Sequence, residues 1–156
     1  MSSKLSESVT IQESPALVFE LTQDYSQRLA WDTFLKKAEL IDAPAADVGV
    51  KAWCVSKHGL GMETEYVSFK PPKVTAITQS KRSMLFKKFS GSWVFEERDE
   101  RTTHVVFTYS YLLNFPFNLV TKFIHNILTK NVRQRLKDLK SYVEQRGQAV
   151  KYATIE

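Results

Sequence analysis

The feature that most constrains this 156-residue sequence is one long apolar stripe with helical spacing near its carboxyl end. Over roughly seven turns, apolar residues recur every three or four positions. They are Val120, Phe123, Ile124, Ile127, Leu128, Val132, Leu136, Leu139 and Val143. This stripe predicts a single amphipathic helix over residues 117–146, with Gly147 as its stop. Such a helix needs a partner that covers its apolar face, and a sheet is the simplest one.

The segments before the predicted helix alternate apolar and polar residues with a period of two, which is typical of strands. They occupy residues 9–11, 38–42, 50–56, 62–69, 74–79, 88–97 and 103–111. Polar, Gly and Pro residues separate most of them and predict an antiparallel meander. Ser14 and Pro15 predict a short helix after the first strand, because serine caps helices and proline suits a first turn.

This order of elements predicts an α+β domain over residues 1–147, followed by a tail of residues 148–156. A meander of about seven strands twists and curls, so we expect the curved sheet to wrap around the long helix. Gly91 interrupts one strand pattern, which predicts a bulge or a tight bend there.

Composition favours a globular protein that works inside the cell. Apolar residues make up 43% of the chain and charged residues 25%, and Cys54 is the single cysteine. One cysteine cannot form a disulfide framework or a zinc site based on cysteine ligands. The amino terminus has no apolar leader segment, and no stretch is apolar enough to span a bilayer. We therefore expect a cytoplasmic protein.

The net charge of +5 is concentrated in the predicted long helix. Residues 121–146 carry seven basic side chains against Asp138 and Glu144. The seven are Lys122, Lys130, Arg133, Arg135, Lys137, Lys140 and Arg146. We interpret them as the solvated face of the helix, with Val120, Ile124, Ile127, Leu136 and Leu139 buried beneath. No base-reading motif accompanies this charge, so nucleic acid is not a favoured partner, whereas transient contact with a membrane surface stays open.

Four segments carry a resemblance to a known superfamily. They are residues 11–19, residues 28–32, residues 89–95 and residues 102–107. Together they resemble the START-like, helix-grip superfamily (SRPBCC), which includes Bet v 1 and the polyketide cyclase/dehydrase-like proteins. Phe86-Lys87-Lys88, ahead of Gly91 and Trp93, is also similar to the coenzyme-Q-binding branch. The resemblance spans residues 7–146 and implies a helix-grip fold with a hydrophobic chamber between sheet and helix.

No catalytic constellation is visible among the polar residues. The three histidines lie in three separate predicted elements, with no partner at metal-ligand spacing. They are His58, His104 and His125. Cys54 sits in an apolar strand, where a thiol is normally inert packing. Glu63 and Glu65 share one strand face, which we expect to meet solvent. No metal site and no cofactor are predicted.

The remaining candidate site is the inward surface, which either fills as a core or stays open as a chamber. The residues predicted to bind a ligand there are Met62, Thr64, Tyr66, Arg82, Trp93, Phe95, Phe107, Tyr109, Tyr111, Phe123 and Ile127. We expect the turn His58-Gly59-Leu60-Gly61 to form a pliable entrance together with residues 80–87.

Three functions follow from the sequence and the resemblance. The first is binding or transport of a hydrophobic small molecule, such as a lipid, a quinone or an aromatic polyketide-like compound, with Tyr66, Tyr109 or Arg82 orienting its polar end. The second is a polyketide cyclase or dehydratase, in which a tyrosine, His58 or Arg82 moves a proton. The third is an interaction protein whose basic helix contacts the phosphates of RNA, ribosome or membrane.

Overall fold

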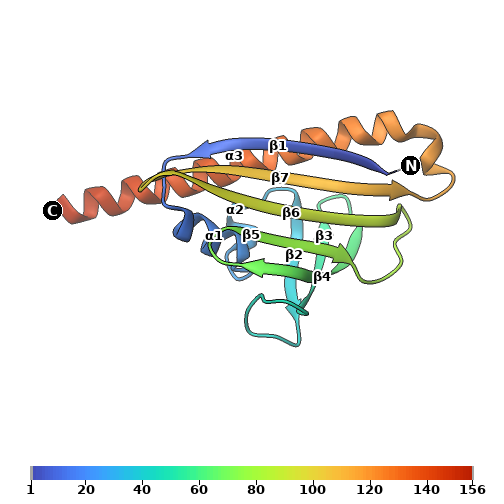
Figure 1. The fold of residues 1–156 in the computed structure, drawn as a ribbon, viewed down its shortest axis with the longest axis horizontal. Coiled ribbons are helices and arrows are strands. Elements are labelled where there is room, and N and C mark those ends of the chain that lie inside the picture. Colours follow the sequence, from blue (N-terminus) through green and yellow to red (C-terminus); the bar gives the residue numbers. More distant parts are fainter. Residues whose placement is uncertain (1, 156) are drawn as a thin grey trace.

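A computed structural model describes the backbone of residues 2–155 and the side chains of residues 2–147. Its elements follow the predicted order (Figure 1). They are β1 (Ser3–Ile11), α1 (Pro15–Gln23), α2 (Arg28–Trp31), β2 (Leu35–Ile41), β3 (Lys51–Ser56), β4 (Gly61–Lys70), β5 (Val74–Gln79), β6 (Phe86–Asp99), β7 (Thr102–Leu113), a 3-10 helix (Phe117–Val120) and α3 (Thr121–Ile155).

The seven strands form one antiparallel sheet in the order β1-β7-β6-β5-β4-β3-β2. The meander from β2 to β7 is as predicted, and β1 adds to its far edge by pairing with β7, from Ser3 opposite Tyr111 to Ile11 opposite Thr103. In Figure 1, β2 and β3 run across the direction of β1 and β7, so the sheet is strongly curved. The predicted α+β helix-grip fold is confirmed, because α3 lies along this curved sheet.

The start of α1 forms as the sequence indicates. The Ser14 hydroxyl caps the helix by accepting a hydrogen bond from the Leu17 amide at 3.4 Å, and Pro15 is the first helical residue. Proline costs nothing at this position because its missing N–H has no partner inside the helix. This cap turns the chain from β1 into α1, which covers one end of the inner face of the sheet.

Gly91 has a different role from the predicted bulge. The register of β6 is regular at Gly91, which pairs with Ile77 on one side and Tyr109 on the other. The irregularities of this strand lie between Phe86 and Lys88 and near its other end. A Cβ atom at position 91 would lie 3.2 Å from the ring of Tyr109. Glycine therefore leaves room for that ring, and a larger residue would have to displace it by a few tenths of an ångström.

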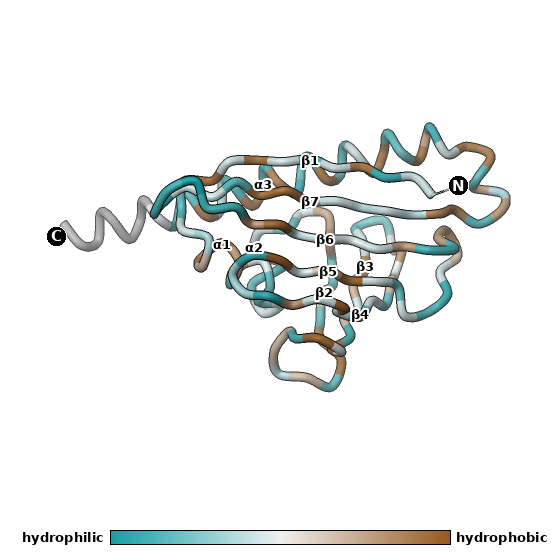
Figure 2. The backbone as a smooth tube through the Cα atoms, in the orientation of Figure 1, coloured by the Kyte–Doolittle hydropathy of each residue, from teal (hydrophilic) through white to brown (hydrophobic). Residues whose placement is uncertain are grey.

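Large apolar side chains from the sheet, α1, α2 and α3 form one core. Figure 2 shows hydrophobic and hydrophilic residues alternating along the strands that contribute to it. Along β7, Thr103, Val105 and Phe107 point inward, and His104 lies on the outer face beside Thr10, as the alternation predicts. Aromatic rings dominate the centre, where Trp93 packs edge-on against Phe107 with ring centres 4.5 Å apart. The buried apolar residues of α3 are Val132, Leu136, Leu139 and Val143.

Several expectations for the long helix are wrong. Ile127 is 43% exposed, and Val120, the last residue of the 3-10 helix, is also exposed, whereas Ile124 and Leu128 on the neighbouring side of the helix pack against the core. The helix also continues through Gly147 to Ile155, so glycine does not stop it. The side chains of the expected tail, residues 148–156, lie outside the described residues. No helix in the described part is long and apolar enough to cross a membrane.

Candidate functional site

A cavity of about 160 Å³ lies between the curved sheet and α3. Its walls are mainly apolar and come from β3 to β7, from α3 and from the segment after α2. The large apolar lining residues are Phe34, Leu35, Leu60, Met62, Ile77, Leu85, Phe86, Phe89, Trp93, Phe107, Leu128 and Val132. In other proteins an apolar cavity of about 150 Å³ accommodates a benzene ring. The inner face is thus partly filled by aromatic packing and partly open.

The cavity brings together about half of the residues that the sequence singled out. Met62, Thr64, Tyr66, Trp93, Phe107 and Tyr109 line it, together with Leu60 from the predicted entrance. Phe95 packs on Phe19 and Trp93 in the core, and Tyr111 packs on Phe86, so neither lines the cavity. Ligand binding by these residues remains a prediction.

Arg82, Phe123 and Ile127 do not line the cavity either, and all three are exposed. Of the predicted entrance, His58 and Gly59 are exposed and stand outside the cavity lining. Gly61 makes a close approach, since a Cβ atom there would lie 2.5 Å from the ring of Trp53. This glycine permits packing inside the β3–β4 hairpin, and the pliability of the turn stays a prediction.

One corner of the cavity holds a buried charge cluster that the sequence analysis missed. Arg28 and Arg135 both line the cavity, and both approach Oδ2 of Asp32. The Arg28 Nε donates a hydrogen bond to it at 2.8 Å. The Arg135 Nε lies 3.0 Å from the same oxygen as an ion pair without hydrogen-bond alignment. Arg135 is only 5% exposed, so its expected place on the solvated face is wrong.

The charges of this cluster do not balance. Burial acts to raise the pKa of Asp32, but the guanidinium groups of Arg135 and Arg28 outweigh it and hold that pKa below its ordinary value. Burial would lower the pKa of each arginine, whereas Asp32 raises it, so both stay charged. Among the described residues, no second carboxylate pairs with either guanidinium. The corner therefore carries one excess positive charge beside an apolar cavity.

Hydroxyl groups extend this corner into the cavity. The Arg135 Nη1 donates a hydrogen bond to the Tyr109 hydroxyl at 2.6 Å, which leaves the hydroxyl proton of Tyr109 free to donate. The Tyr66 hydroxyl donates to the Gln23 side-chain oxygen at 2.6 Å and lies 3.3 Å from the Tyr25 hydroxyl, and all three residues line the cavity. Burial raises the pKa values of Tyr25 and Tyr66, so both remain neutral.

Two signals in the sequence point to the charge cluster. Leu128, Val132, Arg135 and Leu139 are spaced four, three and four residues apart, so Arg135 interrupts the inward stripe itself. Arg28 and Asp32 are an opposite-charge pair at i and i+4 in the short α2 region. Each signal indicates a charged side chain near the interior, but neither shows that Arg135 contacts the Arg28–Asp32 pair.

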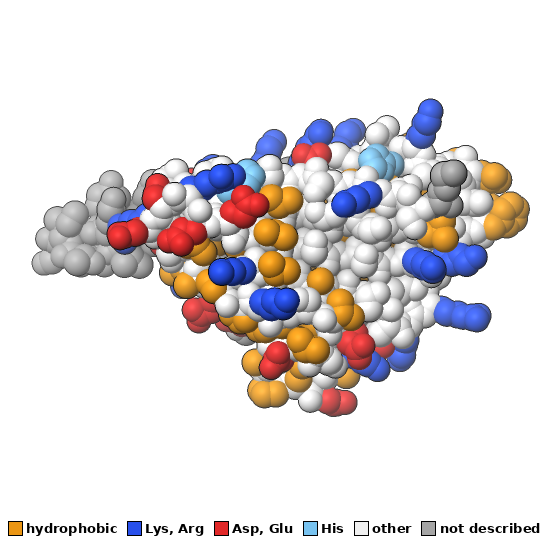
Figure 3. Space-filling view, viewed as in Figure 1, with side chains coloured by type: hydrophobic (Ala, Val, Ile, Leu, Met, Phe, Trp, Pro, Cys, Tyr) orange, Lys and Arg blue, Asp and Glu red, His pale blue; other side chains and the backbone are white. Residues whose placement is uncertain are grey.

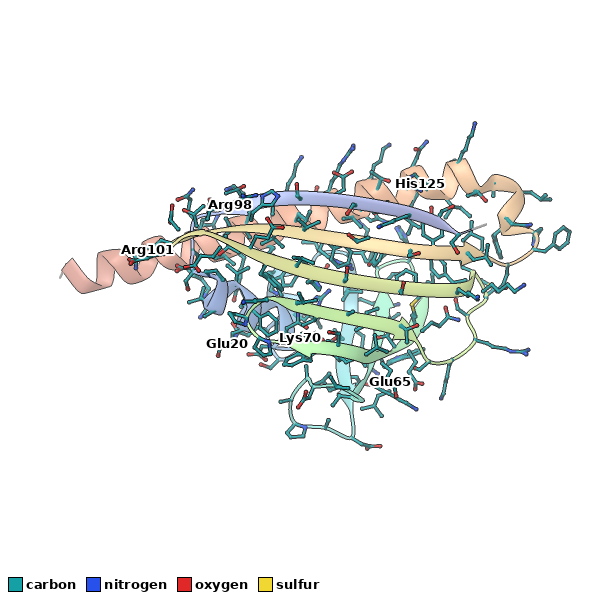
Figure 4. All side chains as sticks on the ribbon, in the orientation of Figure 1. Glu20, Glu65, Lys70, Arg98, Arg101 and His125 are labelled. Atoms are coloured by element: carbon teal, nitrogen blue, oxygen red, sulfur yellow. The ribbon has the colours of Figure 1, made fainter. Side chains whose placement is uncertain are left out.

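Of the other candidate groups, His125 lies away from the cavity and Cys54 lines it. His125, labelled in Figure 4, faces β7 from the first half of α3, and its Nδ1 lies 2.7 Å from the Tyr111 hydroxyl. Cys54 lines the cavity, and burial raises the pKa of its thiol, which disfavours the nucleophilic thiolate. Residues 2–147 contain no group of three or more His, Cys, Asp or Glu side chains that could hold a metal ion.

Glu63 corrects the expectation for its strand face. It is buried, its carboxylate accepts a hydrogen bond from the Ser80 hydroxyl at 2.9 Å, and the Lys81 amino group lies 3.6 Å away. The segment after β5 folds over the outer face of β4 and covers this carboxylate. Glu63 is therefore a structural anchor for residues 80–81.

Comparisons with solved structures identify proteins of the same fold. The chain superposes on an aromatase/cyclase (Zhui) from a Streptomyces species with a TM-score of 0.82 at 16% identity, covering 96% of this chain and 98% of that one. A protein from Thermus thermophilus superposes with a TM-score of 0.78 at 20% identity, covering 92% of this chain and 99% of that one. A START superfamily protein from Mycobacterium smegmatis superposes with a TM-score of 0.73 at 13% identity, covering 91% of this chain and 97% of that one.

At these identities the likeness shows the fold alone, which is the helix-grip fold described above. A search of curated protein sequences finds no match. The family comparison goes further, because residues 2–144 match the family described as "Polyketide cyclase / dehydrase and lipid transport". This match covers nearly the whole chain, so the protein belongs to the polyketide cyclase/dehydrase and lipid transport family.

Proposed function

We propose that the protein binds a small hydrophobic molecule in the cavity and holds one oxygen of that molecule at the corner formed by Arg135 and Tyr109. The observation that carries this proposal is the pairing of an apolar chamber with hydrogen-bond donors at one end. Ligand sites commonly combine apolar walls with a few convergent polar groups that fix orientation. The family match, which includes lipid transport, supports the same class of function.

The size of the cavity favours a compact ligand. At about 160 Å³, the cavity suits a molecule of one or two rings better than an extended lipid chain. Apolar burial stabilises such a complex by about 25 cal/mol for each Å² removed from water. The aromatic walls, Trp93 and Phe107 among them, offer ring faces and edges against which an aromatic ligand packs.

The polar corner favours an oxygen that carries negative charge. Arg28 and Arg135 share a single carboxylate, so a carboxylate or phenolate on the ligand would balance the excess positive charge. The free proton of Tyr109 adds a donor to the same place. Buried donors without partners are costly, and a ligand oxygen would satisfy them.

Binding measurements with benzoate and benzamide test the proposal, since the two probes are similar in shape and differ in charge. We expect saturable binding in NMR titrations, with benzoate the tighter. Tyr109→Phe should weaken benzoate binding by about tenfold, because a charge-assisted hydrogen bond is lost. Tyr111→Phe is the matched control, because its hydroxyl lies outside the cavity. Absence of saturable binding for both probes would overturn the proposal.

Cyclase or dehydratase activity is the second candidate, and the same corner favours it. Donors aimed at one point of a closed cavity stabilise an enolate oxygen as it develops. The test is product formation from a linear β-polyketone, followed by ultraviolet absorbance. Turnover that falls in Tyr109→Phe and persists in Tyr111→Phe would assign catalysis to this corner. Binding without turnover would assign a carrier.

A further inference from the structure

An exposed apolar surface lies at one end of the molecule, away from the buried core. Of the ten large hydrophobic side chains exposed in the described part of the chain, six belong to two neighbouring segments. They are Met84, Phe115, Leu119, Val120, Phe123 and Ile127, and we call them the apolar tip. Phe115 is 78% exposed and Phe123 is 66% exposed. Soluble monomers rarely leave such side chains grouped in water, so the tip indicates an interaction site.

Hydrogen bonds hold the two segments of the tip together. The Asn114 side chain donates to the carbonyl oxygens of Ser83 at 2.8 Å and Met84 at 3.1 Å. The Asn114 amide donates to the Leu85 carbonyl oxygen at 2.9 Å. The loop before β6 is thus fixed beside the loop that leads into the 3-10 helix and α3. Figure 1 places both segments at the same end of the molecule.

Basic side chains surround the tip, and acidic ones are absent from its sequence. Residues 80–95 and 112–137 contain no Asp or Glu. The exposed basic residues of these two stretches include Arg82, Lys87, Lys88, Lys122 and Lys130. Figure 3 shows hydrophobic side chains at this end of the molecule, with Lys and Arg side chains on either side. The surface therefore combines projecting apolar groups with an unopposed positive charge.

We propose that the apolar tip docks on an anionic phospholipid membrane. Phenylalanine and leucine side chains insert at the boundary between headgroups and acyl chains, while flanking lysines contact lipid phosphates. A second copy of the chain fits the surface less well. Two tips facing each other would bring their lysines together without any carboxylate from these segments to oppose them.

The apolar tip adjoins one end of the cavity in the chain, so docking would bring a membrane close to that end. Leu85 and Phe86 follow Met84 directly and line the cavity, and Leu128 follows Ile127 and does the same. A membrane bound at the tip would lie beside this end of the cavity. A hydrophobic ligand that partitions into lipid would then have a short path between bilayer and protein. Docking itself requires no ligand, so it can fail or hold independently of the proposed binding function.

Co-sedimentation with lipid vesicles tests the docking. The purified protein is mixed with vesicles of phosphatidylcholine alone, or of phosphatidylcholine with phosphatidylglycerol. We expect binding to the anionic vesicles that weakens with added salt. The double variant Phe115→Ser/Phe123→Ser should reduce the partition constant by at least about tenfold. Both side chains are exposed, so its thermal midpoint should stay that of the wild type.

Matched variants distinguish vesicle binding through the apolar tip from nonspecific binding by other exposed side chains. Val48→Ser/Val67→Ser removes two exposed apolar side chains outside the tip and should leave vesicle binding unchanged. Lys87→Gln/Lys122→Gln should weaken binding to the anionic vesicles several-fold. Arg98→Gln/Arg101→Gln removes equal charge from the opposite end of β6 and β7, as Figure 4 shows, and should have little effect.

Two results would overturn the proposal. One is absence of binding to anionic vesicles at low salt, or binding that Phe115→Ser/Phe123→Ser leaves unchanged. The other is self-association without vesicle binding. In that case analytical ultracentrifugation would show a dimer that the same double variant dissociates, and the tip would be an interface between two copies of the chain.

Discussion

Two parts of α3 differ in how far their apolar residues are covered. We call residues 121–131 the first half and residues 132–147 the second half of this helix. In the second half, Val132 and Leu139 are buried against the core, and Leu139 is 0% exposed. In the first half, Ile124 and Leu128 lie on the same side as Val132 and Leu139 and pack against the core. Phe123 and Ile127 project into solvent because they lie on another side of the helix. Phe123 is nine residues before Val132, which at about 100° per residue places the two on opposite sides. The difference teaches that apolar residues spaced three or four apart can extend beyond the side of a helix that the rest of the protein covers.

The neighbours of each half explain the contrast. The second half is held to β1 by two polar contacts, from Arg133 to Glu7 at 3.0 Å and from Lys140 to the Thr10 carbonyl oxygen at 2.6 Å. It also carries Arg135, which reaches Asp32 after α2. The first half lies beside β1 and β7 with one side, where His125 contacts Tyr111, and its Phe123 and Ile127 side has no covering element in the described part of the chain. We therefore expect substitutions in the second half to lower the free energy of unfolding, and those in the exposed part of the first half to leave it nearly unchanged.

The largest expected loss of stability comes from Asp32→Ala. This change leaves Arg28 and Arg135 buried without the carboxylate that they share. Breaking a buried charge pair in this way costs about 3–5 kcal/mol. Urea unfolding measures the loss. Asp138→Ala is the control on the partly exposed side of α3, where the carboxylate bonds to Thr33, and it should cost about 1 kcal/mol. Equal losses in both variants would contradict a special role for the cluster.

Leu139→Ala should follow, with a loss of about 2–5 kcal/mol in the free energy of unfolding. Its side chain is fully buried, so the change removes apolar contacts and leaves a new cavity. The same urea experiment gives the value. A loss below about 1 kcal/mol would mean that the second half of α3 packs more loosely than the structure indicates.

The pH dependence of stability tests the charge of Asp32. Its pKa is lowered in the folded protein, so the stability it contributes is complete above the ordinary carboxyl pKa of about 3.9 and is lost as the pH falls through the folded value. Asp32→Asn lacks this titration. Between about pH 5 and pH 1, the wild type should lose more stability than the variant. If the free energy of unfolding falls equally with pH in the wild type and in Asp32→Asn, the pKa of Asp32 is not lowered in the folded protein.

Ile127→Ala should have the smallest effect, below about 0.5 kcal/mol, because an exposed side chain has little burial to lose. Thermal unfolding of Ile127→Ala and Leu139→Ala under the same conditions compares the two variants directly, since both changes remove a branched aliphatic side chain from the same helix. A loss comparable with that of Leu139→Ala would show that the first half is covered in solution, and the apolar tip would then be smaller than proposed.

Much of the fold could be predicted from local patterns. The strand alternation placed Val105 and Phe107 on the inner face, and Ser14 with Pro15 marked the start of α1. These features depend on a residue and its near neighbours in the chain. The same patterns indicated Tyr66, Phe107 and Tyr109 for the inner surface, and all three line the cavity.

The charge cluster could not be predicted in this way. Arg135 looks like one of seven bases on a solvated helix, and its burial becomes visible only when α2 brings Asp32 beside it. The exposure of Phe123 and Ile127 was hidden for the converse reason, since their spacing predicts a buried face. Arg82 was expected at the cavity and lies in solvent.

The sequence by itself determined the order of the elements, the inward face of most strands and the membership of a helix-grip superfamily. Only the tertiary structure decided which part of α3 is covered, where the cavity stays open and which charges meet inside. The physical reason is that periodicity and capping are properties of a single element, set by its own backbone geometry. Burial and charge pairing depend on whichever element lies opposite, and that neighbour is distant in the chain.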